Sequence, residues 1–387
     1  MSPAAIGSLF TKEVSRPIEG VVKADDTEHL SVEIDEYVLT GETASALSDF
    51  LEVYTAPVYG GGNGVWISGF FGSGKSHLLK MLAHLLGDVP GEGAARRPAA
   101  EAFAAKAQGD AMLGGLLARA GRIPATSLLF NIDQKAPLID KNQTDALLQV
   151  FVKVFNEARG YYSGDPSVAR FERDLDRRGL LGDFTAAFED AAGVAWEQGR
   201  EEGILQEHNV TLAWSRVTGE AGTHNILSRY EDQYSLSIED FADEVAQWLA
   251  AQAPEHRLLF MVDEVGQFIG SDTRLMLNLQ TIVETLSTKC AGRAWVCVTS
   301  QEDMDGVIGD RTRTQGNDFS KIQARFATRM KLTSRDVEEV IEKRLLGKNA
   351  DGEAALDPLY SRHHARKVIQ QASGRISGKR YYDGPLP

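Results

Sequence analysis

The stretch GVWISGFFGSGKSHLLKML, residues 64–82, decides the fold class that this sequence predicts. It opens with a short apolar, β-branched run over residues 64–68, which suits a buried strand. It closes with leucines at helical spacing, and this helical pattern continues beyond the stretch to Leu86 before Gly87 ends it. Between the two, residues 69–76 read G-x-x-x-x-G-K-S, the pattern of a phosphate-binding loop. A strand, a glycine loop and a helix N-terminus in this order predict an anion site.

The residue types in this loop suit a nucleoside triphosphate. Backbone N–H groups converge on a phosphate at such a loop, and the helix dipole adds about half a positive charge there. Glycines at positions 69, 72 and 74 allow tight curvature and a close approach of the backbone. We expect Lys75 to reach the β- and γ-phosphates and the Ser76 hydroxyl to bind Mg²⁺. An accidental glycine-rich turn is the alternative. The expected ligands are ATP and Mg²⁺, contacted by Gly69, Phe70, Phe71, Gly72, Ser73, Gly74, Lys75, Ser76 and His77.

Three further runs, residues 126–132, 258–262 and 294–298, predict the rest of a core sheet. The last two are apolar throughout rather than alternating, as expected for parallel strands that are covered on both faces. Because these strands alternate with helices, the predicted fold class is α/β, with a doubly wound parallel sheet. Together with the loop pattern, this predicts a P-loop NTPase of the ASCE type. Ligand chemistry is expected at the carboxyl ends of the strands.

The chain divides into three expected parts. Residues 1–60 look like an N-terminal extension, and residues 61–335 form the expected ATPase core. Within the core, residues 160–256 lack a strong strand and carry aromatics at helical intervals, which predicts a helical insertion. Residues 336–387 form a short C-terminal helical extension, either the start of a helical lid or a truncated C-terminal region.

Two helix starts carry capping patterns. Ser237 with Asp240 predicts a capping box at the start of the last helix of the insertion. Thr333 with Asp336 predicts a cap on the helix that follows the core.

Two acidic residues follow the run 258–262. Asp263 closes that strand, where its carboxylate can hold Mg²⁺ through water beside Ser76. Glu264 can accept a proton from the water that attacks the γ-phosphate, a contribution of about 10²–10⁴-fold in rate. The alternative is an ordinary solvated turn. The strand at 126–132, between the two motifs, favours the ATPase branch with an added central strand and a catalytic glutamate.

Further candidates for phosphate contacts follow the run 294–298. Gln301 can contact the γ-phosphate or the attacking water, and Ser300 is the second choice for this role. Arg325 lies near the end of a helix expected just before a short strand, and Arg329 is the second choice. In an oligomer, an arginine in this place reaches a neighbour's nucleotide, worth about 10³–10⁵ in rate. The alternative for Arg325 is a surface salt bridge worth about 0–1 kcal/mol.

Composition limits the classes of partner. The formal charge of −14 argues against a basic surface for bulk nucleic-acid binding. Two windows are locally basic: residues 311–335 hold seven Lys/Arg against one acid, and residues 361–387 hold six against one. We therefore expect only weak DNA binding by this chain.

The pair Cys290 and Cys297 predicts buried, reduced thiols. No apolar run approaches the ~18–20 residues that span a bilayer, and residues 1–20 lack a secretory pattern, so we expect a cytoplasmic location without membrane contact.

The sequence also resembles a known family, over about residues 8–347. The matching phrases are LF from Leu9, RPIEGVVK from Arg16, DEYVLT from Asp35, GVWISGFFGSGKSHLLKML from Gly64, DEVGQFIG from Asp263, VTSQEDMDGVIG from Val298, IQARFATRMKL from Ile322 and EVIEKRLL from Glu339. They resemble the N-terminal ATPase module of the BREX phage-defence P-loop proteins, the BrxC/PglY family. The resemblance implies an AAA+-type ATPase that acts with other BREX components, including a DNA methyltransferase. Members of that family are much longer, and no match extends beyond about Ala350.

Three functional hypotheses follow. The first is an ATP-hydrolysing AAA+-like motor or switch that serves a phage-defence complex as a homo-oligomer. The second is a nucleotide-dependent assembly scaffold with little turnover. The third is an ATPase of the DNA-replication or transposition type with the same core.

Overall fold

The computed structural model describes residues 7–13, 30–56, 62–90, 96–107, 109–136, 143–220, 222–270, 272–301 and 325–355. The segment 16–23, which carries part of the family resemblance, lies outside these residues. So do 311–324 and 361–387, which make up most of the two basic windows. The expectation of weak DNA binding therefore rests on the sequence alone.

A five-stranded sheet, parallel throughout, lies at the centre of the described chain. Its order is β2-β3-β4-β1-β5. The predicted α/β class with a parallel central sheet is thus confirmed, as is the short strand expected after the helix that holds Arg325. The strands are β1 (Gly64–Gly69), β2 (Ala125–Asn131), β3 (Arg257–Asp263), β4 (Ala294–Ser300) and β5 (Thr328–Leu332).

The strand that separates β1 from β3 is β4, not β2. β4 pairs with β1 on one side and with β3 on the other, whereas β2 lies at the edge beyond β3. The expectation that the strand at 126–132 supplies the added central strand is therefore wrong. The burial of β2 fits its place, because three of its seven residues are only partly buried, whereas β3 and β4 are buried throughout.

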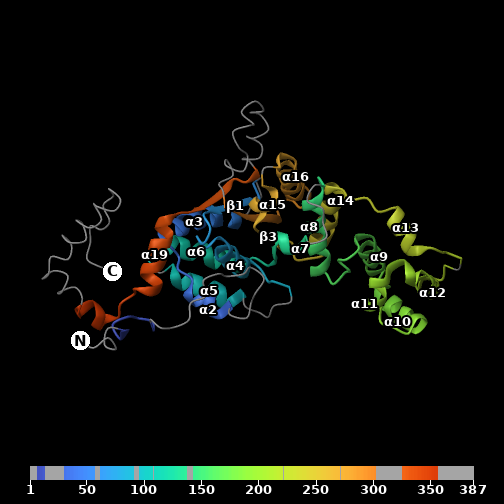
Figure 1. Cartoon of the computed structure of the whole chain (residues 1–387), viewed down its shortest axis with the longest axis horizontal. Coiled ribbons are helices and arrows are strands. Elements are labelled where there is room, and N and C mark those ends of the chain that lie inside the picture. The colour runs from blue at the N-terminus through green and yellow to red at the C-terminus, as the bar shows by residue number, and fades with distance from the viewer. Residues whose placement is uncertain are drawn as a thin grey trace, which may run out of the picture.

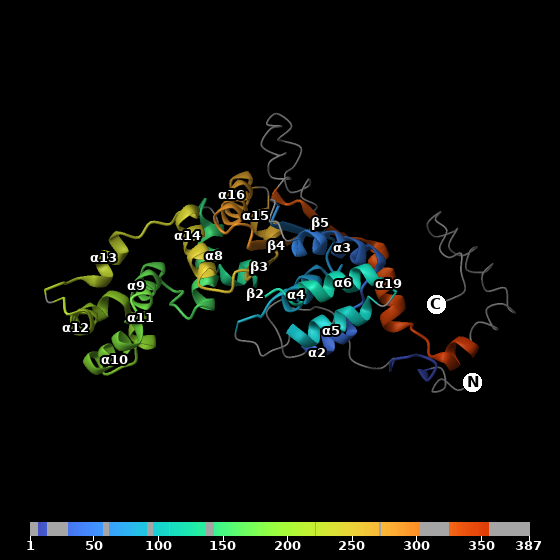
Figure 2. The ribbon, with the colours of Figure 1, turned by 180° about the vertical axis from the view of Figure 1, so that it is seen from behind.

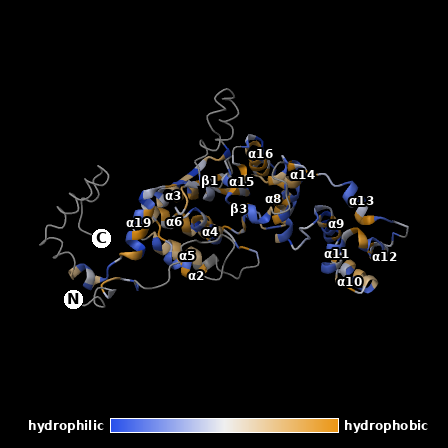
Figure 3. Cartoon of the chain, viewed as in Figure 1, coloured by the Kyte–Doolittle hydropathy of each residue, from blue (hydrophilic) through white to orange (hydrophobic). Residues whose placement is uncertain are grey.

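Successive residues of a strand point to opposite faces of the sheet. Both faces of this sheet carry apolar side chains, and helices cover both. Phe260 and Val296 contribute to the apolar cluster on the first face, and Met261 and Cys297 to that on the second. The helices on the first face are α8 (Ala146–Ala158), α14 (Ile238–Ala250) and α16 (Thr273–Lys289). Those on the second face are α3 (Gly41–Thr55), α4 (Lys75–Leu86), α5 (Arg96–Lys106) and α6 (Ala111–Ala120). Figures 1 and 2 show these two groups on opposite sides of the strands, and hydrophobic colour gathers on helices such as α4, α6 and α16 (Figure 3).

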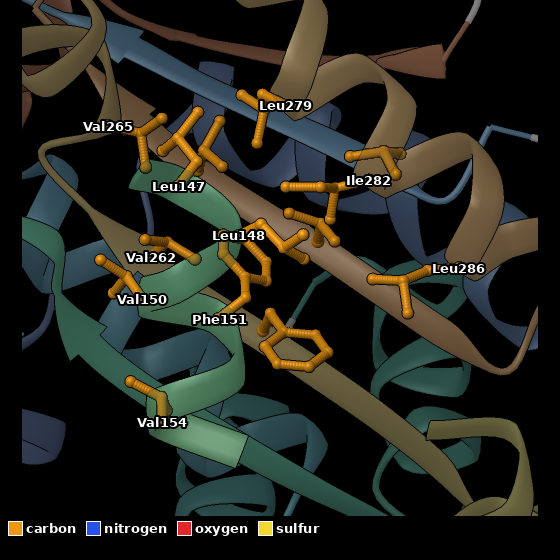
Figure 4. Packing of buried hydrophobic residues seen from close by; sticks show 14 of the residues in the cluster. Leu147, Leu148, Val150, Phe151, Val154, Val262, Val265, Leu279, Ile282 and Leu286 are labelled. Atoms are coloured by element: carbon orange, nitrogen blue, oxygen red, sulfur yellow. The ribbon is translucent and has the colours of Figure 1, made fainter. Parts of the chain in front are cut away.

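The cluster on the first face joins α8 and α16 to the sheet. Figure 4 shows Leu148 and Phe151 of α8 meeting Ile282 and Leu286 of α16 over the strands. Each such buried side chain contributes about 1.5–3 kcal/mol. This packing holds β3 and β4 firmly, and so fixes the positions of the residues at their carboxyl ends.

Residues 30–55, part of the expected N-terminal extension, pack into the second layer. Leu47, Phe50 and Leu51 of α3 have no exposed surface. The short helix α2 (Leu30–Glu36) precedes α3 and packs on α5.

The helix α19 (Ser334–Leu345) follows the sheet and begins with the capping box predicted for Thr333 and Asp336, both halves of which form. At the start of α14, the Ser237 hydroxyl accepts a hydrogen bond from the Asp240 N–H at 3.0 Å, which is the half of the predicted box that the structure shows.

The helices α9 to α13 form a separate body, here called the helical body, at one end of the molecule (Figure 1). They surround an apolar cluster of their own, with Phe171, Phe184 and Trp196 at its centre. The last helix of the predicted insertion, α14, packs on the sheet instead. The helical body comprises α9 (Pro166–Arg177), α10 (Leu181–Ala192), α11 (Trp196–Glu202), the 3₁₀ turn Gly203–Gln206, α12 (Glu207–Thr218) and α13 (Ile226–Asp232).

Both cysteines are buried free thiols, as predicted. Burial raises the pKa of Cys290 and of Cys297 to about 12, so both stay protonated at neutral pH.

Candidate functional site

A cavity of about 460 Å³ lies at the carboxyl ends of the strands. The residues that line it come from the turn between β1 and α4, the ends of β2, β3 and β4, the segment 36–43, and α19. In an open parallel sheet this edge is where ligands bind. The lining includes Phe71, Gly72, Ser73, Gly74, Lys75, Ser76, His77, Asp263, Glu264 and Gln301 from the residues that the sequence singled out.

The turn between β1 and α4, residues 70–74, is here called the glycine loop. Gly72 and Gly74 have φ values of 80° and 91°, in the left-handed region that favours glycine. Gly69, the last residue of β1, is tightly enclosed. A Cβ there would lie 2.6 Å from Ser73 Oγ and 2.9 Å from the Leu332 carbonyl oxygen. Gly72 and Gly74 are therefore favoured by their backbone conformation, and Gly69 by the close approach of its neighbours.

The N-terminus of α4 faces the cavity. Its N-cap, Gly74, supplies no side-chain hydrogen bond, and the Leu78 N–H bonds the Gly74 carbonyl at 2.8 Å. The helical N–H groups that precede Leu78 have no acceptor within the helix. Ser73 Oγ is also buried without a partner among the described residues. This end of the cavity therefore offers hydrogen-bond donors and the positive end of a helix dipole.

Lys75 supplies the cation at this end. Its Nζ donates to the Phe70 carbonyl at 3.0 Å. Burial lowers the pKa of Lys75, whereas the carboxylates of Asp263 and Glu264 act in the opposite direction. The ammonium group and the two carboxylates thus lie close enough to interact.

Hydrogen bonds join the residues at the ends of β2, β3 and β4. Asn131 Nδ2 donates to Glu264 Oε2 at 2.8 Å. The Thr299 hydroxyl donates to Asp263 Oδ1 at 2.5 Å and accepts from the Glu264 N–H at 2.8 Å. Glu264 has a φ of 64°, which is unusual for a residue with a side chain. Both acidic residues are therefore held in defined orientations.

The other end of the cavity, between the segment 36–43 and α19, has an apolar surface beside polar and charged groups. The apolar surface consists of Tyr37, Val38, Leu332, Val337 and Val340, and is here called the apolar end; Glu36, Thr40, Thr43, Asp336 and Arg344 line the cavity beside it. Apolar walls with a few placed polar groups are typical of a pocket for a flat organic ring. The cavity therefore has a polar, cationic end and an apolar end.

Hydrogen bonds hold the apolar end together, although its two walls are far apart in sequence. Asp336 of α19 is 4% exposed, and its carboxylate accepts from the Thr40 hydroxyl, 296 positions away. Its Oδ2 accepts from the Thr333 N–H at 2.7 Å. Glu339 accepts from the Gly41 N–H at 3.0 Å. The position of α19 is thereby tied to the segment 36–43.

Arg344 and His77 complete this wall. Arg344 Nε donates to Glu36 Oε2 at 2.7 Å, and both side chains line the cavity. His77 lies edge-on to Tyr37, with ring centroids 4.9 Å apart. Burial, and next the nearby Arg344 guanidinium, lower the pKa of His77 to about 4, so the imidazole is neutral at neutral pH.

The remaining candidates divide between the cavity and other places. Gln301 and Ser300 both line the cavity, the first exposed and the second 2% exposed. Phe70 contributes its carbonyl to Lys75, while its side chain is 47% exposed outside the lining.

Arg325 does not line the cavity. It lies at the amino end of the sheet, where its carbonyl oxygen would be 2.6 Å from a Cβ on Gly64. Its guanidinium forms an ion pair with Glu284. Within one chain, the structure therefore shows the salt bridge that was the alternative for this residue.

The residues around Ser76 and Asp263 fit a Mg²⁺ ion bound together with phosphates. Among the described residues no group of three or more His, Cys, Asp or Glu side chains forms a metal cluster. Mg²⁺ commonly takes one or two carboxylates and completes its shell with water and phosphate oxygens. Asp263 and Ser76 both line the cavity, and Thr299 engages one oxygen of the Asp263 carboxylate.

Sequence reasoning missed several residues of this site. Asn131 lies within the run predicted as a strand, and Thr299 precedes the two candidates Ser300 and Gln301. Both could have been found by asking which polar residues end neighbouring parallel strands. Asp336 and Arg344 gave no such signal, because their contacts depend on how α19 packs.

No protein-family model matches this chain, and no solved structure matches it. Within the described residues, none of the helices has both the length and the apolar character that crossing a membrane would require.

Proposed function

We propose that this chain is a P-loop ATPase of the AAA+/ASCE type that binds and hydrolyses ATP with Mg²⁺. One observation carries the proposal: the glycine loop, Lys75 and the pair Asp263–Glu264 meet in one cavity at the carboxyl ends of a parallel sheet. These are the groups that phosphate binding and water activation need, in one place.

Each group has a distinct role in this proposal. The N–H groups of the glycine loop and of the first turn of α4 bind phosphate oxygens, and Lys75 neutralises their charge. Asp263 and Ser76 hold the metal, which when bound would offset the charge of the β- and γ-phosphates. Glu264 takes the proton of the attacking water. Gln301 contacts the γ-phosphate or that water.

The apolar end of the cavity takes the nucleobase. Tyr37, Val38, Val337 and Val340 provide the flat, apolar surroundings that a purine ring needs. Because α19 forms part of this wall, base binding and the position of α19 are linked. Arg325, at the opposite edge of the sheet, does not contact this cavity, so its proposed role requires a nucleotide held by another copy of the chain, and the proposal therefore includes a homo-oligomer.

The biological setting comes from the sequence resemblance to the BREX phage-defence family. The phrase DEYVLT, which is part of that resemblance, supplies Glu36, Tyr37, Val38 and Thr40 to the cavity lining. We therefore place the proposed ATPase in a BREX-type complex, acting with other components that include a DNA methyltransferase.

Glu264→Gln provides the test of hydrolysis. It keeps the shape of the side chain but removes the base, so phosphate release should fall about 10²–10⁴-fold while the affinity for ATP stays the same. Glu189→Gln, at an exposed carboxylate on α10, is the matched control and should keep full turnover. Equal rates for Glu264→Gln and the wild type would remove Glu264 from catalysis. Tight ATP binding by a wild-type protein that shows no turnover would favour the second hypothesis, a nucleotide-dependent assembly scaffold.

A further inference from the structure

Thr299, at the end of β4, joins the two acidic residues of the cavity. It is 1% exposed and lines the cavity. Its hydroxyl makes the two bonds described above, one to the Asp263 carboxylate at 2.5 Å and one from the Glu264 N–H at 2.8 Å. One buried hydroxyl therefore contacts the side chain of the first acid and the backbone of the second.

A hydroxyl can make both of these contacts from a single atom. It offers one O–H donor and two acceptor lone pairs, so it can donate to a carboxylate and accept from an amide together. Valine has the same shape and can do neither. Serine can do both, although threonine's branched Cβ restricts χ1 more strongly. The side chain is thus specified by hydrogen bonding and not by packing alone.

The first bond fixes the carboxylate of Asp263. A carboxylate that is 4% exposed, with Oδ1 committed to Thr299, has a defined plane. Partners of this kind hold a metal-binding carboxylate in the orientation that the metal requires.

The second bond supports the turn at Glu264. A non-glycine residue in the left-handed region persists where its surroundings hold it, at a cost of about 1–3 kcal/mol. Here the Glu264 N–H is held by Thr299, and its side chain by Asn131 at 2.8 Å. Losing the hydrogen bond between the Glu264 N–H and Thr299 frees the backbone that positions the Glu264 carboxylate.

We propose that Thr299 is a positioning residue that sets Asp263 for the metal and Glu264 for the attacking water through one hydroxyl. This inference rests on the proposed ATPase function. It predicts that metal binding and turnover depend on the Thr299 hydroxyl, whereas metal-free nucleotide binding, which uses the glycine loop and the apolar wall, does not.

Thr299→Val and Thr299→Ser test the proposal. Loss of such a partner typically costs 10–100-fold in metal affinity or activity, so we expect Thr299→Val to lose about that factor in both. Mn²⁺ affinity in the presence of a non-hydrolysable ATP analogue, followed by electron paramagnetic resonance, gives a readout independent of turnover. Nucleotide affinity in EDTA should stay unchanged, and kcat should fall more than KM rises. Thr299→Ser should restore most of the loss.

Thr55→Val is the matched control. Thr55 is also buried, at 6% exposure, but its hydroxyl bonds the Leu51 carbonyl within α3, outside the cavity lining. This variant should keep the metal affinity and turnover of the wild type. If Thr299→Val does not fold, Thr299→Ala carries the same prediction without placing a methyl group against the carboxylate.

Wild-type Mn²⁺ affinity and turnover in Thr299→Val would overturn the positioning role, as would a serine variant that is as impaired as the valine variant. Failure of the wild type to bind the nucleotide analogue at all would instead overturn the proposed function. The two failures are therefore distinguishable.

Discussion

The ion pair between Lys80 and Glu33 is buried next to the proposed nucleotide cavity. Lys80 lies in α4, one turn beyond Ser76, and its side chain has no exposed surface. Its Nζ is 2.6 Å from Glu33 Oε2, on a side chain that is 10% exposed. Removing one partner of such a pair leaves a buried charge without its counter-charge, at a cost of about 3–5 kcal/mol. Glu33→Met and Lys80→Met should each destabilise the fold by that amount.

The double variant should behave differently. Methionine has a volume similar to both side chains, and replacing a whole buried ion pair by apolar residues is often neutral or stabilising by about 1–4 kcal/mol. We therefore expect the protein with methionine at both positions to recover most of the stability that either single variant loses. Urea unfolding of the four proteins measures the coupling as a double-mutant cycle.

Additive losses in the double variant would refute this reasoning, because they would show that the two charges do not interact. A second effect should appear in binding. Since α2 leads directly into the cavity residues 36–40, each single variant should also weaken nucleotide affinity.

Three further predictions concern acid stability, packing and assembly. Burial lowers the pKa of His77 and of His84 to about 4, so between about pH 6.5 and about pH 4 only the unfolded chain takes up these protons. The free energy of unfolding should therefore decrease as the pH is lowered through this range, by up to about 1.4 kcal/mol per pH unit for each histidine. A free energy of unfolding that does not change with pH in urea titrations would contradict this. Gly266→Ala would place a Cβ 2.0 Å from Ser300 Oγ, so we expect a loss of about 1–3 kcal/mol in thermal unfolding, and an unchanged midpoint would show that the contact relaxes freely. Arg325→Ala should keep ATP affinity and lose turnover, and ATP should promote self-association in light scattering; a wild-type monomer in ATP, with full activity in the variant, would exclude a role in trans.

The positions of strands β1 to β4 could be predicted from the sequence, because each of these strands coincides with a short apolar run. Four runs, at 64–68, 126–132, 258–262 and 294–298, lie within strands β1 to β4 or overlap them within one residue. Burial on both faces leaves a continuous apolar run that is visible without any tertiary information. The order of the strands within the sheet has no such local signal in the sequence. The runs themselves do not say which strand lies between which neighbours, and β2 was placed wrongly for that reason.

The candidate site was predictable where its chemistry is local. The glycine loop, Lys75 and Asp263–Glu264 follow their strands directly, so motif and position coincide. Asp336 and Thr40 lie 296 positions apart, and only packing brings them together. The left-handed turn at Glu264 was also invisible, because an acidic residue gives no sign of a positive φ.

The most direct test of the account is whether the cavity binds a nucleoside triphosphate through Lys75. Isothermal titration of a slowly hydrolysed ATP analogue with Mg²⁺ would compare the wild type with Lys75→Ala, and with Lys343→Ala as an exposed lysine outside the cavity lining. A hydrogen bond to a charged group contributes about 1.5–3 kcal/mol, so Lys75→Ala should weaken binding about 10–100-fold. Lys343→Ala should bind as the wild type does. Equal affinity in the wild type and in Lys75→Ala, or no binding by the wild type, would contradict the central claim.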